Sequence, residues 1–224
     1  MPLNSGMSES ESSMTAARSD GARRRNRKGL ETRARILESA VACINRLGYA
    51  ATTVDAIMQD TGLSRGSVLN QFPTRTEMMV EVADYAMHAT IRHSNRLLAE
   101  FGTSREAVIG FFDVTWKGQQ TPHGIAMTEI LLAARWDAAL AEGLKPIAEQ
   151  VETEIDDQAG KTAESAGVED LAAWLTHVRV LILSLRGIVI ESTYDDDRPA
   201  IRQAVVRLRQ MHERQCGRLL PGKP

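Results

Sequence analysis

The sequence predicts an all-α fold of about nine helices, with a small N-terminal unit of three helices followed by a helical bundle. Apolar residues recur at steps of three and four along most of the chain, which is the period of an amphipathic helix. Glycine, proline and capping residues separate these stretches, as at Gly62, Gly167 and Pro199. No stretch has the alternating pattern that indicates a half-buried β-strand.

The first two helices of the N-terminal unit have clear ends. Apolar residues at helical steps over residues 36–47 predict a first helix that stops at Gly48. Thr52 or Thr53 is placed to cap a second helix by accepting its free N–H groups. Gly62 is expected to end that helix because glycine adopts positive φ without steric cost.

A third helix is expected to be very short. Ser64 can cap it, and Pro73 disfavours the α conformation of the residue before it, so the helix covers only about residues 65–71. Thr74 and Glu77 then form a capping-box pattern for the next helix. A helix of two turns buries little surface, so its expected use is to be presented to a partner.

The rest of the sequence predicts six longer helices and a division of the chain into four segments. The helices are expected near residues 75–100, 104–118, 122–135, 137–165, 169–193 and 198–215. The expected segments are a disordered arm at 1–28, a three-helix unit at 29–75, a helical bundle at 76–218 and a tail at 219–224.

The charge distribution indicates where a polyanion would bind. The formal net charge is −2, but residues 1–80 carry a net charge of +3 and the rest carry −5. Five basic residues lie just before the first apolar pattern: Arg23, Arg24, Arg25, Arg27 and Lys28. Such a run is either a solvated, disordered tail or an arm that follows a phosphate backbone.

Composition argues against several other classes of protein. Cys43 and Cys216 are far apart, so neither a disulfide framework nor a metal-binding spacing is indicated. No apolar run approaches the roughly 20 residues that cross a bilayer, and no secretory signal is evident. We therefore expect a cytoplasmic protein that associates with the nucleoid when bound to DNA. We expect no catalytic residues, cofactor, metal or membrane partner.

The N-terminal unit resembles the TetR family of bacterial transcriptional regulators. The resemblance spans Glu31 to about Val82 and follows the family's order and spacing in these segments: Ile36–Ala40, Leu47–Tyr49, Thr52-Thr53, Asp55–Ile57, Thr61–Gly66, Phe72-Pro73 and Arg75. It implies a homodimer, an operator-binding N-terminal domain and a divergent C-terminal domain that binds a small molecule and releases DNA. At two positions where the family tends to carry an aromatic residue, this chain has Leu69 and Gln71.

Within that resemblance, the short helix is expected to read DNA. Arginine can contact phosphate or guanine, and asparagine or glutamine can pair with adenine, whereas glycine permits close backbone approach. The candidate DNA-binding residues are Arg23, Arg24, Arg25, Thr52, Thr53, Arg65, Gly66, Ser67, Asn70, Gln71 and Arg75. For the two threonines, pure capping is an equal alternative.

Aromatic, methionine, histidine and amide residues of the bundle suggest an apolar cavity with a few polar groups. The candidates are His88, Phe111, Phe112, Trp116, Gln120, His123, Met127, Trp136, Trp174 and His177. Ordinary core packing is the competing interpretation for each. The expected effector is a small hydrophobic or amphipathic molecule.

The last two helices carry more apolar surface than one packed face requires, which predicts a dimer interface about a two-fold axis. The candidate interface residues are Ile182, Leu185, Val189, Val205, Leu208 and Met211. The leading interpretation is a ligand-responsive repressor that binds a palindromic operator on double-stranded DNA. The alternatives are a helical-bundle enzyme or binding module with a purely structural N-terminal unit, and a regulator controlled by a partner protein.

Overall fold

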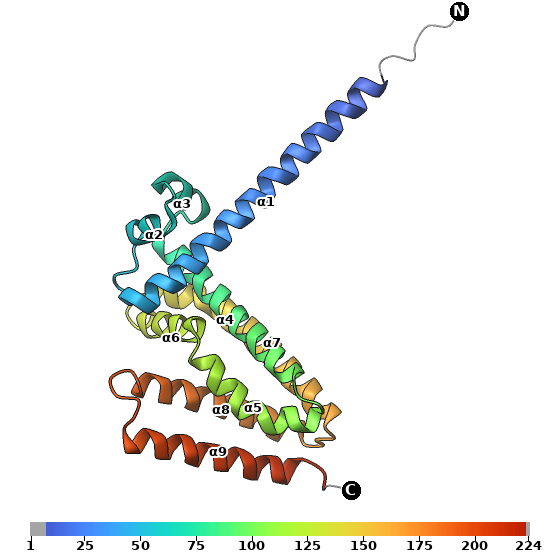
Figure 1. Cartoon of the computed structure of the whole chain (residues 1–224), viewed down its shortest axis with the longest axis vertical. Helices are drawn as coiled ribbons and strands as arrows, with labels where there is room; N and C mark the ends of the chain where they lie inside the picture. The colour runs from blue at the N-terminus through green and yellow to red at the C-terminus, as the bar shows by residue number, and fades with distance from the viewer. Residues whose placement is uncertain (1–7, 223–224) are drawn as a thin grey trace, which may run out of the picture.

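The computed structural model describes the backbone of residues 8–222 and the side chains of residues 26–222. This part of the chain forms nine helices and no strand, which confirms the all-α prediction (Figure 1). The helices are α1 (Ser8–Leu47), α2 (Val54–Thr61), α3 (Arg65–Gln71), α4 (Arg75–Ala99), α5 (Ser104–Gln119), α6 (Pro122–Ala134), α7 (Ala138–Ser165), α8 (Leu171–Glu191) and α9 (Pro199–Leu219).

The short helix α3 begins and ends where the local signals predict. Gly62 lies in the left-handed region at φ 67° and ends α2, as the sequence requires. The Ser64 hydroxyl accepts a hydrogen bond from the Ser67 N–H at 3.2 Å, which caps α3. The Thr74 hydroxyl accepts one from the Glu77 N–H at 3.1 Å and so begins α4. The Ser64 cap therefore sets the start of α3, and the Thr74 cap begins the next helix a few residues after α3 ends.

The N-terminal arm differs from the expectation of disorder. Helix α1 runs without interruption for 40 residues, and its first half projects away from the rest of the molecule (Figure 1). Residues 1–7 lie outside the described residues. No proline interrupts 8–28, and most of its residues are compatible with a helix, so the helix that packs further along extends through this segment.

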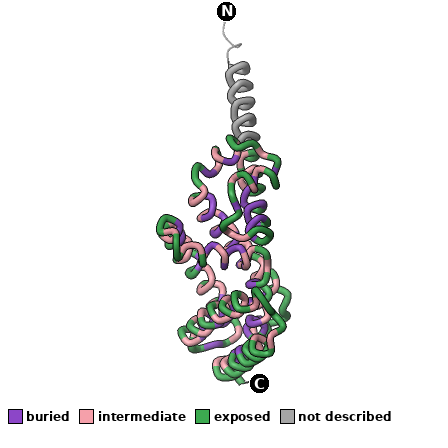
Figure 2. The backbone as a smooth tube through the Cα atoms, turned by 90° about the vertical axis from the view of Figure 1, so that its left-hand side faces the viewer, coloured by how far each residue is buried: buried purple, intermediate pink, exposed green. Residues whose placement is uncertain are grey.

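Helix α4 connects two hydrophobic cores. Its first half contributes Met78, Val82 and Ala86 to a core shared with α1, α2, α3, α6 and α7. Its last turn contributes Leu98 to a second core among α5, α7, α8 and α9. The purple segments in Figure 2 follow these two cores, and the outward side of α9 is exposed.

The domain boundary expected at residue 75 does not separate two hydrophobic cores. The first core includes Ile130 of α6 and Leu140 of α7, so residues 29–75 share their core with the bundle. Helix α4 has 25 residues and is therefore roughly 37 Å long at 1.5 Å per residue. In Figure 1, α3 lies at one end of the molecule and the α8–α9 pair at the other. A displacement of α4 would therefore be felt at both ends.

Candidate nucleic-acid interface and ligand cavity

Helix α3 presents a polar face and is held by apolar residues beneath it. Val68 and Phe72 are buried in the first core. Arg65, Gly66 and Asn70 are exposed. Ser67, Leu69 and Gln71 are half-buried at the edge of the same helix. The exposed groups include the guanidinium and amide types that recognise phosphates and base edges.

Arg65 lies within an exposed ion pair. Its guanidinium contacts the Asp55 carboxylate of α2 at 2.8 Å, and the two side chains are 60% and 69% exposed. An ion pair so open to solvent contributes little stability, because water screens it. Arg65 can therefore exchange Asp55 for a phosphate or a guanine at small cost.

The sequence analysis did not anticipate how α3 is held from α1. The Arg33 guanidinium lies 4.4 Å above the Phe72 ring and donates a hydrogen bond to the Gln71 carbonyl at 3.2 Å. It also contacts the Glu81 carboxylate of α4 at 2.6 Å. Arg33 thus joins α1, the end of α3 and the start of α4. The only sequence signal for this role was its position next to the motif.

Two candidate DNA-binding residues have internal roles instead. Thr52 is fully buried, and its hydroxyl donates to the Gly48 carbonyl at 2.9 Å, so that side chain has no access to a phosphate. The Arg75 guanidinium donates to the carbonyls of Tyr49 at 2.6 Å and Thr52 at 3.1 Å. It also stacks on the Tyr49 ring at 4.3 Å. These contacts fix the loop between α1 and α2.

The other expected contacts keep open positions or lie outside the description. Thr53 is exposed and caps α2, with its hydroxyl accepting from the Ala56 N–H at 3.2 Å. Arg27 and Lys28 are exposed on α1. The side chains of Arg23, Arg24 and Arg25 lie outside the described side chains. Because α1 is helical there, any contact from this run to DNA would come from a helix face.

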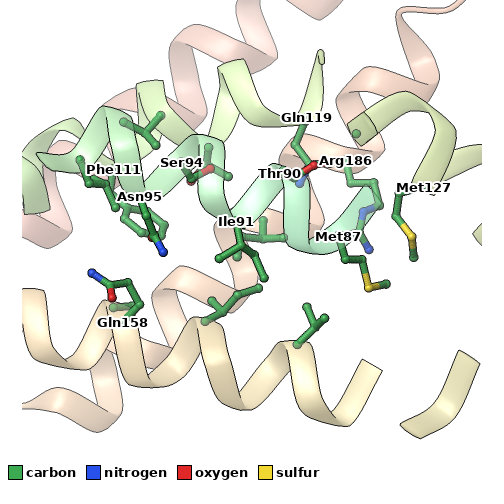
Figure 3. Close-up of a pocket in the computed structure, with 18 residues that line it drawn as sticks. Met87, Thr90, Ile91, Ser94, Asn95, Phe111, Gln119, Met127, Gln158 and Arg186 are labelled. Carbon is green, nitrogen blue, oxygen red and sulfur yellow. The ribbon is translucent and has the colours of Figure 1, made fainter. Parts of the chain in front are cut away.

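A cavity lies between α4, α5, α6, α7 and α8, and its volume is about 100 Å³. Figure 3 shows side chains of α4 along its length, with Met87 toward one end and Asn95 toward the other. The lining is mostly apolar, with a few neutral polar groups and one charged group. The lining residues are Met87, Thr90, Ile91, Ser94, Asn95, Leu98, Phe111, Val114, Thr115, Gln119, Gly124, Met127, Val151, Ile155, Gln158, Ala159, Ile182 and Arg186.

Only two of the ten expected ligand residues, Phe111 and Met127, line this cavity. The other eight are corrected by the structure because their side chains are committed elsewhere or face solvent. Phe112, Trp116 and Trp174 pack in or against the second core, and the Trp174 indole N–H donates to the Ala159 carbonyl at 3.0 Å. Trp136 is 84% exposed.

The expected polar residues are also placed elsewhere. His88 contacts the carboxylates of Asp84 and Glu154 at 3.2 and 3.4 Å. His123 faces Glu38 of α1 at 3.4 Å, and Gln120 is exposed at the end of α5. His177 is hydrogen-bonded to His212 at 3.0 Å. The residues that do line the cavity come mainly from α4, α5 and α7, and no motif in the sequence marked those of α4 and α7.

The cavity lies beside the contacts that hold α1 against α4 and α6. Glu38 of α1 accepts a hydrogen bond from the Tyr85 hydroxyl of α4 at 2.7 Å. Asn45 of α1 donates to the Pro122 carbonyl at the start of α6 at 2.8 Å. Gly124 lines the cavity, and a Cβ there would lie 2.5 Å from the Gly118 carbonyl oxygen, so α5 and α6 meet too closely for any side chain. A change in cavity shape would therefore bear directly on the support of α1.

The outer face of α8 and α9 corrects the expected dimer interface. Leu185 and Leu208 are buried within the chain, and Ile182 lines the cavity, so these three do not form a free surface. Val189 and Val205 are half-buried, and Met211 is 48% exposed. Met211 thus keeps an open position, and the other apolar residues of these two helices that face solvent are Val180, Leu183, Ile190 and Val206.

Helix α8 also corrects the expectation about apolar runs. Among the described residues, α8 is the one helix that is long enough and apolar enough to cross a membrane, judged by length and composition alone. Its most apolar window has a mean hydropathy of 1.6. Only 22% of that window is buried within the chain, and Arg179 and Arg186 lie in the helix. Its exposed apolar face therefore calls for a covering partner.

Comparison with known proteins identifies the N-terminal part. Residues 36–82 match the model of the tetR family of bacterial regulatory proteins. The chain is 25% identical over 182 residues to the uncharacterized HTH-type transcriptional regulator Rv2912c of Mycobacterium tuberculosis, covering 79% of this chain and 93% of that protein.

Solved structures share the fold along most of the chain. A TetR-family transcriptional regulator from Cytophaga hutchinsonii has a TM-score of 0.67 at 15% identity, covering 88% of this chain and 98% of that one. The multidrug binding protein EbrR, solved with imidazole, has a TM-score of 0.54 at 20% identity, covering 86% and 92%. At these identities the likeness concerns the fold.

Proposed function

We propose that the chain, whose residues 36–82 match the tetR family of bacterial regulatory proteins, is a transcriptional regulator that binds a palindromic operator as a homodimer and is released by a small molecule. The observation that carries the proposal is α3, a two-turn helix held by Val68 and Phe72 that keeps Arg65, Gly66 and Asn70 exposed. A helix held in this way fits the major groove of duplex DNA. The protein would act in the cytoplasm, at the nucleoid when bound to DNA.

The proposed dimer forms through the outer face of α8 and α9. Leu183 is 57% exposed and Val206 is 55% exposed, and these helices lie at the end of the chain opposite α3 (Figure 1). Pairing two copies through this end produces a two-fold molecule with two α3 helices. Such a molecule reads two inverted half-sites about one turn of DNA or somewhat more apart.

The proposed release acts through α4 and the α5–α6 junction. Helix α4 contributes Met78 and Val82 to the core under α3, and further along it contributes Ile91 and Asn95 to the cavity wall. A ligand that fits the cavity better in one position of α4 than in another shifts the population of the two positions. In the favoured position the two α3 helices no longer match successive major grooves, which makes the protein a repressor that its ligand releases.

Selection of duplexes from a random library with the full chain tests this function. The expected product is an inverted repeat, with each half-site read by one α3. Asn70→Ala should relax the preference at the same position of both half-sites, since asparagine pairs with adenine. Gln150→Ala, which removes an exposed amide on α7, is the matched control. Failure to enrich any sequence, or enrichment of an asymmetric single site, contradicts the proposal.

A further inference from the structure

One charged side chain in the cavity, that of Arg186, has no hydrogen-bond or ion-pair partner among the described residues. The Nε atom of Arg186 is buried and makes no hydrogen bond to any described residue. Burial lowers the pKa of this guanidinium, and no neighbouring charge offsets the shift. An arginine stays protonated in proteins, so the cavity contains a positive charge that the fold does not neutralise.

Another arginine of the same helix shows what a satisfied partner set looks like. Arg179, also on α8, contacts the Glu152 carboxylate at 3.3 Å and the Asp156 carboxylate at 3.0 Å, both on α7. Arg186 lies two helical turns further along, where the cavity wall supplies no carboxylate. Burying an unpaired charge is unfavourable, so a position such as that of Arg186 indicates a missing anion.

The rest of the wall defines what else the anion must carry. Ile91, Leu98, Phe111, Val151 and Ile155 form an apolar lining with no charge of its own. Figure 3 places the nitrogen atoms of Arg186 between Met87 and Met127, at the end of the cavity away from Asn95 and Gln158. A ligand with one charged end and an apolar body would therefore satisfy both parts at once.

The size of the cavity limits that body. Its volume is about 100 Å³, whereas an apolar cavity of about 150 Å³ admits a benzene molecule. A short aliphatic chain is of this order, whereas a single ring requires the cavity to widen. Gln119, buried beside the cavity, can add a hydrogen bond from its amide to the charged end.

We propose that the effector of this regulator is a small apolar carboxylate, bound with its carboxylate on the Arg186 guanidinium and its body along α4. Guanidinium and carboxylate form two parallel hydrogen bonds, which adds orientation as well as affinity. The inference rests on the proposed function, because it names the ligand class of the same cavity. Arg186 binds the charged end of the ligand, and the lining residues of α4, α5 and α7 contact its apolar body.

Thermal unfolding of the full chain with matched probes tests this inference. The probes are butyrate, hexanoate, octanoate, benzoate and phenylacetate, their uncharged amides, and acetate, which has the charge without the body. We expect at least one of the larger carboxylates to raise the unfolding temperature by mass action, while its amide and acetate have little effect. Arg186→Met should weaken that carboxylate roughly 10- to 100-fold, and Arg186→Lys should restore part of the affinity.

Arg179 provides the control variant. Arg179→Gln removes a cation of the same helix whose partners lie outside the cavity, and it should keep the carboxylate response. An amide as effective as its carboxylate, a carboxylate effect that survives Arg186→Met, or no effect of any carboxylate overturns the inference. Duplex binding by the wild-type protein, measured on the same preparation, separates this failure from failure of the proposed function.

Discussion

The arginines around α3 and the arginine in the cavity differ in how completely the fold satisfies them. Around α3, Arg33 and Arg46 meet the carboxylates of Glu81 and Asp60, and Arg35 and Arg75 donate to backbone carbonyls. In the cavity, Arg186 meets neither a carboxylate nor a carbonyl among the described residues. These arginines of the first region find partners within the chain, whereas Arg186 would find one only in a ligand.

Two buried side-chain polar atoms among the described residues lack a hydrogen-bond partner. One is the Tyr49 hydroxyl, in the loop between α1 and α2, and the other is Nε of Arg186. An unpaired neutral hydroxyl is a modest penalty, but an unpaired charge is a much larger one. The contacts around α3 thus hold one fixed shape, whereas in the bundle the proposed carboxylate would offset the penalty at Arg186.

The bundle is also incomplete on its outer face, and the largest expected effect comes from there. Leu183→Glu places a charge on the exposed apolar face of α8 and should convert a dimer into monomers without loss of helix content. Binding to a palindromic duplex should then be almost abolished, because one α3 reads only half of the site. Light scattering and fluorescence anisotropy measure the two effects.

Leu132→Glu is the matched control, because Leu132 is 50% exposed on α6, away from α8 and α9. It should leave both assembly and duplex binding unchanged. A dimeric Leu183→Glu protein would place the interface elsewhere.

The second prediction tests whether Arg75 acts through contacts within the chain or through contact with DNA. Arg75→Gln removes hydrogen bonds to the carbonyls of Tyr49 and Thr52 and the stacking on the Tyr49 ring. We expect a loss of about 3 kcal/mol in the free energy of unfolding, measured by urea titration. The slope of duplex affinity against salt should stay as in the wild type. A slope reduced by about one would instead make Arg75 a phosphate contact.

A smaller effect is expected at the exposed end of the same network. Arg65→Ala removes a cation that is 60% exposed and paired only with Asp55. Stability should change little, but duplex affinity should fall roughly 10- to 100-fold. Asp55→Asn, which frees Arg65, should bind duplex at least as tightly as the wild type. Tighter binding after Arg65→Ala would remove this residue from the interface.

The smallest effect concerns a pair of histidines in the second core. The pKa of His177 is lowered to about 4, first by burial and then by the nearby His212, and burial also lowers the pKa of His212. We assign the His177 Nε2–H as donor to His212 Nδ1 at 3.0 Å, with the His212 Nε2–H donating to the Ile109 carbonyl at 3.0 Å. Both rings are then neutral in the folded protein.

This arrangement makes stability depend on pH in a definite direction. An unfolded histidine binds a proton near pH 6.5, so between that pH and about 4 the unfolded chain binds more protons than the folded one. The contribution of His177 is therefore complete above pH 6.5 and is lost as the pH falls toward 4. We expect it to lower the free energy of unfolding by about 2 kcal/mol between pH 7.5 and 5.

His177→Leu should flatten that part of the profile, measured by urea titration at each pH. The matched control is His93→Leu on α4, which should keep the slope. An unchanged slope in His177→Leu would show that the carboxylates of the chain determine the acid sensitivity.

The α3 region was largely predictable from the sequence because its signals are local. Positive φ at Gly62, the Ser64 cap and the Thr74 cap each depend on residues within three or four positions. The bounds of the longer helices followed from the same type of signal. Thr52 and Arg75 were misassigned because their partners, Gly48, Tyr49 and Thr52, are reached only through the turn of the folded loop.

The cavity was much less predictable because it depends on how five helices meet. Aromatic content indicated a cavity, but Trp174 is in the core and Trp136 is in solvent, and composition cannot distinguish these positions. Periodicity marked the apolar residues of α8 without showing which face the chain itself covers, so Leu185 was assigned to the outside. Arg186 was visible as an interruption of an apolar run, and that interruption was the signal.

We propose that occupation of the cavity and binding of DNA are coupled, and reciprocal affinity measurements reveal such coupling. The affinity of a selected duplex is measured with and without a carboxylate that raises the unfolding temperature, and the affinity of that carboxylate is measured with and without the duplex. Thermodynamic linkage requires both ratios to be the same, and we expect each affinity to fall by roughly 5- to 150-fold. Ratios of one, with both ligands bound at the same time, would contradict the claim.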